Sequence, residues 1–150
     1  MLNEDYRDMF QSLIGENVKF LLVGAYAMAA HGYPRATMDI DIWVMPDPQN
    51  ADAVLRALRR FGSPLHGLKA EDLQKEGTVY QIGVAPRRID IITSVSGLKF
   101  EETYERSIET DVEGLCIRIP SLDDLIQNKK MSGRKKDLVD VDALEALKNA

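Results

Sequence analysis

The sequence predicts an α/β fold (α+β) with a mixed sheet of about four or five strands and helices mainly on one side. Residues 18–23 form a nearly all-apolar run, which is typical of a buried strand. Residues 35–44 alternate strictly between polar and apolar side chains, as a half-buried strand does. Two further strand-like runs, 78–84 and 87–93, are separated by a short connection and fit a hairpin.

Helical patterns cover most of the remaining chain. Apolar residues at helical spacing predict a helix over residues 2–14, with Gly15 as its stop. Asp47 followed by Pro48 predicts the N-cap and first position of a covering helix that reaches Phe61. The other predicted elements are a short helix near 71–75, an edge strand over 115–119, a helix opened by Ser121, and a final helix from about Lys136.

Length and composition fit one domain. The 150 residues predict a core of about 16–120 and a helical C-terminal part of about 121–150. No apolar run approaches the roughly 18 residues of a membrane span, and the acidic N-terminus is unlike a signal peptide. We therefore expect a cytoplasmic protein without a membrane partner.

The net charge and the cysteine count argue against several other kinds of binding site and cross-link. A net charge of −5 argues against a broad nucleic-acid surface, although it leaves a local basic patch open. Cys116 is the only cysteine, which excludes an intramolecular disulfide and a cysteine-rich zinc site. Its apolar neighbours predict a small buried residue.

The polar face of the strand at 35–44 carries two carboxylates. Arg35, Thr37, Asp39 and Asp41 share this face because strand side chains alternate. Two neighbouring carboxylates repel each other unless a cation lies between them. The pair therefore predicts a metal site.

Two other features extend this site. Asp90 lies in an apolar strand, on the same face as Arg88, and by itself fits an ion-pair partner as well as a metal ligand. Gly24 joins the first strand to a helical segment over 25–30, and such a turn exposes free amides that bind anions. Three aspartates beside a phosphate cradle can hold one or two Mg²⁺ ions and a nucleotide.

This arrangement resembles the nucleotidyltransferase fold superfamily. The matching segments are Val23-Gly24-Ala25, Met38-Asp39-Ile40-Asp41-Ile42 and Asp90. Small bacterial and archaeal proteins of this fold are similar to two longer segments, VGAYAMAAHGYPRATMDIDIWV and the C-terminal SLDDLIQNKKMSGRKKDLVDVDAL. Those proteins include the minimal nucleotidyltransferases and the abortive-infection or toxin–antitoxin group. The resemblance covers most of the chain and is absent from 62–77, to which we assign no role.

The resemblance implies a metal-dependent reaction. Asp39, Asp41 and Asp90 would bind Mg²⁺ (or Mn²⁺), and Asp90 would act as the base on an acceptor hydroxyl. The implied reaction moves a nucleoside monophosphate from an NTP, with ATP the first choice, to a protein, an RNA end or a small molecule. We further expect the two aspartate-bearing strands to lie side by side at the centre of the sheet, and the metal cleft to open between the sheet and the helix that begins at Gly24.

The resemblance also implies a nucleotide site. The amides of Gly24, Ala25 and Tyr26 would hold the outer phosphates. Arg35 and Thr37 would contact phosphate or orient the carboxylates. Ala25 departs from the family pattern, which has Gly or Ser there, so any hydroxyl contact to phosphate is lost.

The basic tail carries a further candidate. Lys129, Asp137 and Asp140 share one side if the helix continues past Gly133. Lys129 would then reach the phosphates, whereas the alternative is a solvated basic turn.

Three interpretations of the whole chain stay open at this point. The first is a nucleotidyltransferase that acts on an NTP and a hydroxyl acceptor. The second is a weakly or non-catalytic protein of this fold that works through a partner protein, as in a toxin–antitoxin pair, or as a homodimer. The third is an exposed strand on which Asp39 and Asp41 only contact water. The three retained carboxylates favour the first, because a scaffold gains nothing from clustered like charges.

Overall fold

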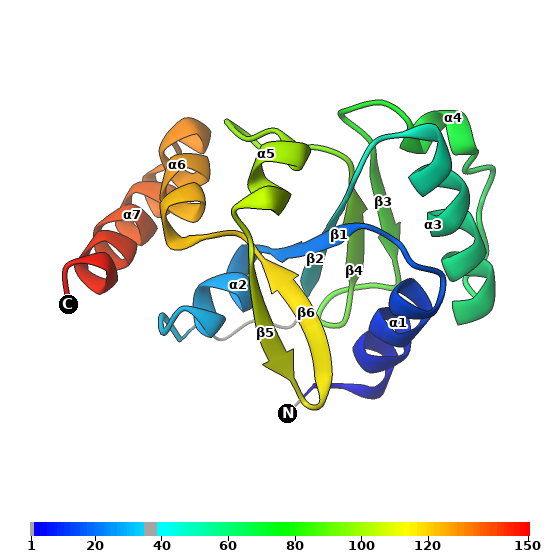
Figure 1. The fold of residues 1–150 in the computed structure, drawn as a ribbon, viewed down its shortest axis with the longest axis horizontal. Helices are drawn as coiled ribbons and strands as arrows, with labels where there is room; N and C mark the ends of the chain where they lie inside the picture. The colour runs from blue at the N-terminus through cyan, green and yellow to red at the C-terminus, as the bar shows by residue number, and fades with distance from the viewer. Residues whose placement is uncertain (1, 35–38) are drawn as a thin grey trace.

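A computed structural model describes residues 2–34 and 39–150 of the chain. At its centre is a four-stranded sheet in the order β1-β2-β4-β3 (Figure 1). β2 and β4 run parallel, and the two outer pairs are antiparallel, so the sheet is mixed as predicted. The strands are β1 (Phe20–Val23), β2 (Ile40–Val44), β3 (Val79–Ile82) and β4 (Ile89–Ile92).

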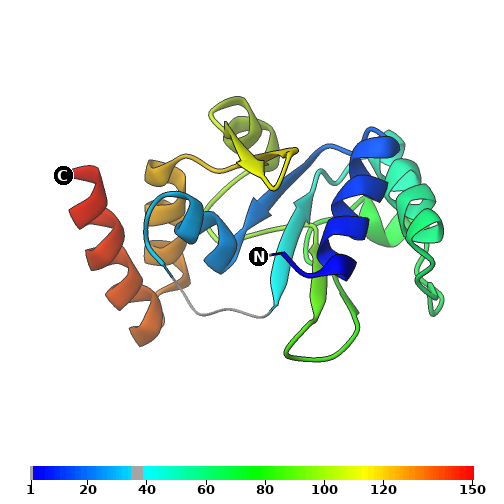
Figure 2. The same ribbon diagram turned by 90° about the horizontal axis from the view of Figure 1, so that it is seen from below.

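One face of this sheet carries the main hydrophobic core. Leu22, Ile42 and Ile91 point to this face and are fully or almost fully buried. The first helix and the long third helix cover it, and they lie against each other in both ribbon views (Figures 1 and 2). The helices that contribute to this core are α1 (Glu4–Gly15), α2 (Gly24–Ala30), α3 (Pro48–Phe61), α4 (Ala70–Leu73), α6 (Leu122–Ser132) and α7 (Lys135–Lys148). The predicted one-sided arrangement of the helices is therefore confirmed.

The opposite face of the sheet has a smaller core. Trp43 of β2 packs edge-on against Phe100, with ring centroids 5.1 Å apart. Phe100 belongs to α5 (Phe100–Glu105), a six-residue helix that the sequence did not predict. Because α5 is short, it covers only part of this face. Asp41 and Asp90 point to the same face, since they alternate with core residues along their strands.

A separate hairpin packs on β1. It joins β5 (Ile108–Val112) and β6 (Leu115–Ile119) in antiparallel pairing. The predicted strand over 115–119 is confirmed, but it lies in this hairpin and not at the edge of the main sheet. The expectation of a buried Cys116 was wrong, because Ile117 and Ile119 take the inward positions of β6 and Cys116 is exposed.

Helix ends follow the predicted capping. The Asp47 carboxylate accepts hydrogen bonds from the first amides of α3, at 2.7 Å from Gln49 N. Ser121 Oγ accepts from Asp124 N at 3.1 Å at the start of α6. α6 ends at Gly133 in the left-handed region, with φ at +68°, so no single helix runs through the tail.

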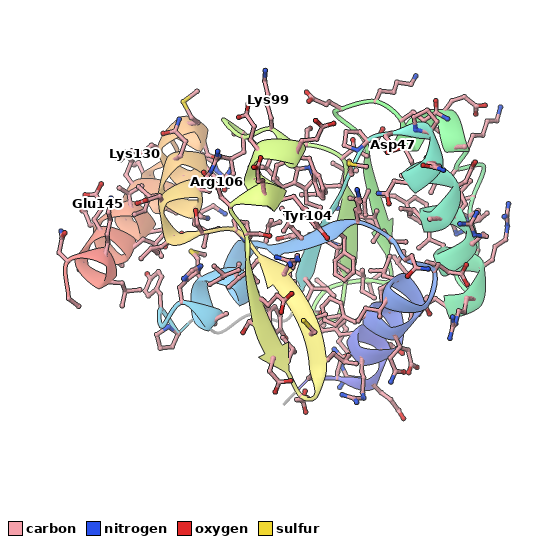
Figure 3. All side chains as sticks on the ribbon, in the orientation of Figure 1. Asp47, Lys99, Tyr104, Arg106, Lys130 and Glu145 are labelled. Atoms are coloured by element: carbon pink, nitrogen blue, oxygen red, sulfur yellow. The ribbon has the colours of Figure 1, made fainter. Side chains whose placement is uncertain are left out.

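Ion pairs connect the C-terminal helices to each other and to the rest of the chain. Lys130 of α6 and Glu145 of α7 pair at 3.0 Å (Figure 3). Arg106, at the end of α5, makes two 3.0 Å contacts with the Asp124 carboxylate. In the described part of the chain, no helix is both long and apolar enough to cross a membrane.

Candidate active site

The two central strands bring Asp41 and Asp90 into register. They are direct partners across the parallel β2–β4 pair, which confirms the prediction that the two aspartate-bearing strands are neighbours. Burial raises the pKa of Asp41 to about 6, and the negative charge of Asp90, a hydrogen bond with Asp90 and the charge of Asp39 act in the same direction. Arg88 partly opposes this shift. Nearby positive charge thus balances only part of the negative charge of this pair.

Arg88 links the other two carboxylates. Its Nε lies 2.9 Å from Asp90 Oδ1, and its Nη2 lies 3.3 Å from Asp90 Oδ2, which makes a two-pronged ion pair. The same Nη2 lies 3.6 Å from Asp39 Oδ2, and the backbone N–H of Arg88 donates to Asp39 Oδ1 at 3.0 Å. Of the two roles that the sequence left open for Asp90, this structure therefore displays the ion pair.

Gly24 sits against the acidic site. It follows Val23, which pairs with Asp41 across β1 and β2. Its φ is +70°, and a Cβ built there would lie 2.5 Å from Asp41 Oδ2. Glycine is thus required both by the backbone conformation and by the space that the carboxylate occupies.

The two residues after Gly24 face away from the acidic site with their side chains. Tyr26 packs edge-on against Tyr6, with centroids 6.1 Å apart, and both Ala25 and Tyr26 border the main core. Any contact of Ala25 or Tyr26 with a ligand at the acidic site would therefore come from the backbone, as the sequence predicted.

A cleft of about 530 Å³ opens on the partly covered face of the sheet. Gly24 and Asp41 line one wall. Lys129 and Arg134, from the junction of α6 and α7, line the other. Asp41 is the one of the three aspartates that lines this cleft. The prediction placed the cleft between the sheet and the helix that begins at Gly24; the structure adds the α6–α7 junction as its far wall.

The tail residues singled out in the sequence converge, but by a different route from the one expected. Lys129 Nζ lies 3.4 Å from Asp137 Oδ1 and 3.3 Å from Asp140 Oδ2. A turn after Gly133, and not a continuous helix, brings them together. The Lys129 side chain is only 14% exposed, so it does not belong to a solvated basic turn.

Arg134 completes this cluster. Its Nε lies 2.7 Å from Asp137 Oδ2. Burial opposes ionisation of Asp137, but hydrogen bonds and positive charges from Arg134 and Lys129 outweigh it and hold the pKa of the carboxyl below its ordinary value. The lining of the cleft thus includes charged side chains of this cluster as well as Asp41.

Comparisons with known proteins identify the family of this chain. A family model described as "Nucleotidyltransferase of unknown function (DUF6036)" matches residues 2–149. The chain belongs to this nucleotidyltransferase family. A search of the curated proteins finds no match. Among solved structures, the chain is similar to a candidate nucleotidyltransferase from Thermotoga maritima, with a TM-score of 0.56 and 16% identity over 99% of this chain and 94% of that one. At this identity the likeness shows the fold alone.

The nucleotidyltransferase family implies a divalent metal ion, and the donor chemistry of this chain fits one. Asp39, Asp41 and Asp90 offer only carboxylate oxygens, the ligands that Mg²⁺ and Mn²⁺ prefer. In the arrangement seen here, however, residues 2–34 and 39–150 contain no group of three or more His, Cys, Asp or Glu side chains placed to hold a metal ion. In this arrangement the guanidinium of Arg88 contacts the carboxylates of Asp39 and Asp90.

Sequence reasoning missed part of the candidate site. Arg88 was noticed only as a residue on the Asp90 face, although an Arg-x-Asp spacing on one strand is itself a signal for an ion pair. Arg134 was not singled out. Arg35 and Thr37, predicted to contact phosphate, lie outside the described residues.

Proposed function

We propose that this chain transfers a nucleoside monophosphate from an NTP, ATP first, to a hydroxyl acceptor and releases pyrophosphate. The acceptor oxygen would attack the α-phosphorus, the bond from that phosphorus to the pyrophosphate oxygen would break, and the hydroxyl proton would pass to a carboxylate. The family match and the fold support a nucleotidyltransferase. The observation that carries the proposal is the registered pair Asp41–Asp90 beside Gly24 at the edge of the cleft.

In this proposal the three aspartates share the metal and proton chemistry. Asp39, Asp41 and Asp90 would hold Mg²⁺ or Mn²⁺, which when bound neutralises charge on the phosphates and lowers the pKa of an attacking hydroxyl. Asp90 would accept the acceptor proton once Arg88 no longer engages it. Asp41, which already lines the cleft, would face the α-phosphate.

The triphosphate would lie between the two walls of the cleft. The amides of Gly24, Ala25 and Tyr26 would bind its outer oxygens, since the Gly24 backbone is already close to Asp41. Lys129 on the opposite wall would supply positive charge. Arg35 and Thr37 stay candidates for phosphate contacts.

The test is label transfer from α-labelled NTPs in the presence of Mg²⁺ and cell extract. Wild type should label an acceptor, and an Asp39→Ala/Asp41→Ala double variant should not. Asp52→Asn, an exposed change on α3, serves as the matched control. The proposal fails if wild type labels nothing with any of the four NTPs, or if the double variant labels as well as wild type.

A second function is favoured by two observations. Arg88 neutralises part of the acidic site without any metal, and Ala25 replaces the Gly or Ser of the family pattern. Both fit a weakly or non-catalytic nucleotidyltransferase-fold protein that acts on a partner protein, as in a toxin–antitoxin or abortive-infection pair. Absence of label transfer together with co-purification of a stoichiometric partner protein would support this function over the first.

A further inference from the structure

Arg88 contacts two of the three aspartates that the proposed function assigns to metal binding. Its guanidinium makes a two-pronged contact with Asp90, at 2.9 and 3.3 Å, and reaches Asp39 at 3.6 Å. It directly precedes β4, two residues before Asp90, and its side chain lies on the same face as that of Asp90. The group therefore supplies positive charge where the three carboxylates repel one another.

The same contacts use carboxylate oxygens that a metal ion would need. A guanidinium and a divalent ion need the same carboxylate oxygens and carry the same sign of charge, so they exclude each other. Asp39 and Asp90 are turned to Arg88, while Asp41 alone lines the cleft. With Arg88 in place, part of the negative charge is therefore neutralised from within.

Arg88 is able to leave this position. About one third of its side chain (33%) is exposed, so the guanidinium can move into solvent without passing through the core. Its backbone N–H would keep its hydrogen bond to Asp39 Oδ1, because that contact does not involve the guanidinium. Release of the guanidinium therefore removes its contacts with the two carboxylates without dismantling β4.

We propose that Arg88 is an internal counter-cation that competes with the divalent ion, so that metal binding requires the guanidinium to leave Asp39 and Asp90. This inference rests on the proposed function, since it assumes that the aspartates bind metal. Arg88 acts as a built-in autoinhibitory contact: it stabilises the carboxylates when no metal is present and sets a threshold concentration for metal binding. Removing it should tighten metal binding for two reasons, loss of a competitor and loss of a repelling charge.

The experiment measures Mn²⁺ binding to the full chain by electron paramagnetic resonance. Arg88→Gln should bind Mn²⁺ about tenfold more tightly than wild type, or more, which is the scale of one charge-assisted ion pair. Arg87→Gln, the exposed neighbouring arginine, is the matched control and should bind as wild type does. Arg88→Lys keeps the charge but loses the two-pronged contact, so its affinity for Mn²⁺ should lie between those of wild type and Arg88→Gln. It also serves as the test variant if Arg88→Gln does not fold without metal.

A second measurement follows Arg88 itself. The Nε–H signal of Arg88 in an NMR spectrum, identified by its loss in Arg88→Gln, should move to the position of a solvent-exposed arginine when Mg²⁺ is added to wild type. Neither measurement depends on transfer activity.

The outcomes separate this inference from the proposed function. Equal or weaker Mn²⁺ binding by Arg88→Gln and Arg88→Lys, or an unmoved Nε–H signal while Mg²⁺ binds, would overturn the role of Arg88 and leave the metal site standing. No Mn²⁺ binding by wild type or by any Arg88 variant would overturn the metal site itself, and the inference with it.

Discussion

Gly24 and Asp41 are so close that the carboxylate occupies the space a side chain at position 24 would need. A Cβ at Gly24 would lie 2.5 Å from Asp41 Oδ2, and the backbone there has φ at +70°. The turn into α2 and the acidic site are therefore a single unit of structure, which explains why a glycine ends the first strand.

Gly24→Ala tests this relationship. We expect a loss of about 2–5 kcal/mol in the free energy of unfolding, from left-handed backbone strain and from overpacking against Asp41. Gly114→Ala is the matched control, because Gly114 has φ at +88° with nothing within 4 Å of its built Cβ. That control should lose only the strain contribution, roughly 1–2 kcal/mol. Urea unfolding measures both, and equal losses in the two variants would contradict the close contact.

Asp41→Asn is predicted to stabilise the metal-free protein at neutral pH. The folded-state pKa of Asp41 is raised from 3.8 to about 6, so the folded protein favours the protonated carboxyl. The contribution of Asp41 to the free energy of unfolding is therefore fully present below its unfolded-state pKa. It is lost as the pH rises through its folded-state pKa, because the buried carboxyl must then ionise. Asparagine cannot ionise, so the variant should exceed wild type above about pH 6 and match it below about pH 4.

Urea unfolding in EDTA across this pH range provides the measurement for Asp41→Asn. Asp52→Asn, an exposed change, should track wild type at every pH. A variant that is less stable than wild type at neutral pH would contradict the raised pKa of Asp41.

Asp137→Asn is predicted to behave in the opposite way. Asp137 is fully buried, and its pKa is held below the ordinary value by Arg134 and Lys129 despite the opposing effect of burial. Its stabilising effect is present above the unfolded-state pKa and is lost as the pH falls through the folded-state value. We expect a loss of about 3 kcal/mol at neutral pH, at the lower end of the range for a broken buried pair, because Lys129 loses Asp137 but keeps Asp140.

The pH dependence of thermal unfolding tests Asp137→Asn. The difference in melting temperature between Asp137→Asn and wild type should narrow under acid conditions. Asp142→Asn, an exposed change on the same helix, should melt at the same temperature as wild type. A gap for Asp137→Asn that widens as the pH falls would exclude a charge-based role for this cluster.

Trp43→Phe is predicted to cost little. The indole of Trp43 is 1% exposed, and its Nε1 has no hydrogen-bond partner among the described residues. Phenylalanine removes that unsatisfied N–H and can keep the edge-on contact with Phe100, so we expect a change within about 1 kcal/mol. Trp43→Ala should lose about 3–5 kcal/mol. Chemical unfolding of both variants gives the comparison, and similar losses would mean that Nε1 has a partner.

Much of the fold could be predicted from local patterns. The strict alternation before Trp43 and the cap at Asp47 each determine one element without help from the rest of the chain. The hairpin strand β5 and the short helix α5 were missed, because β5 is mostly polar and exposed and α5 has only six residues. Their positions depend on packing against β6 and Trp43, which no local pattern encodes.

The candidate site was predictable as a set of residues but not as an arrangement. Strand periodicity placed Asp41 on the polar face of its strand and Asp90 on the face opposite its apolar neighbours, and their register confirms that the two strands are neighbours. The orientation of Asp90 toward Arg88 could not be predicted, because a carboxylate on that face fits a guanidinium as well as a metal ion. The meeting of Lys129 and Asp137 likewise depends on the turn after Gly133.

The most direct test of the central claim is the fate of each phosphate of ATP. Wild-type protein is incubated with Mg²⁺, cell extract and ATP labelled either at the α- or at the γ-phosphate, with Asp41→Asn in parallel. We predict that the α-label alone appears in an acceptor, that the γ-label leaves as pyrophosphate, and that Asp41→Asn transfers neither. Transfer of the γ-label, or equal transfer of the α-label by wild type and Asp41→Asn, would contradict nucleotidyl transfer at this site.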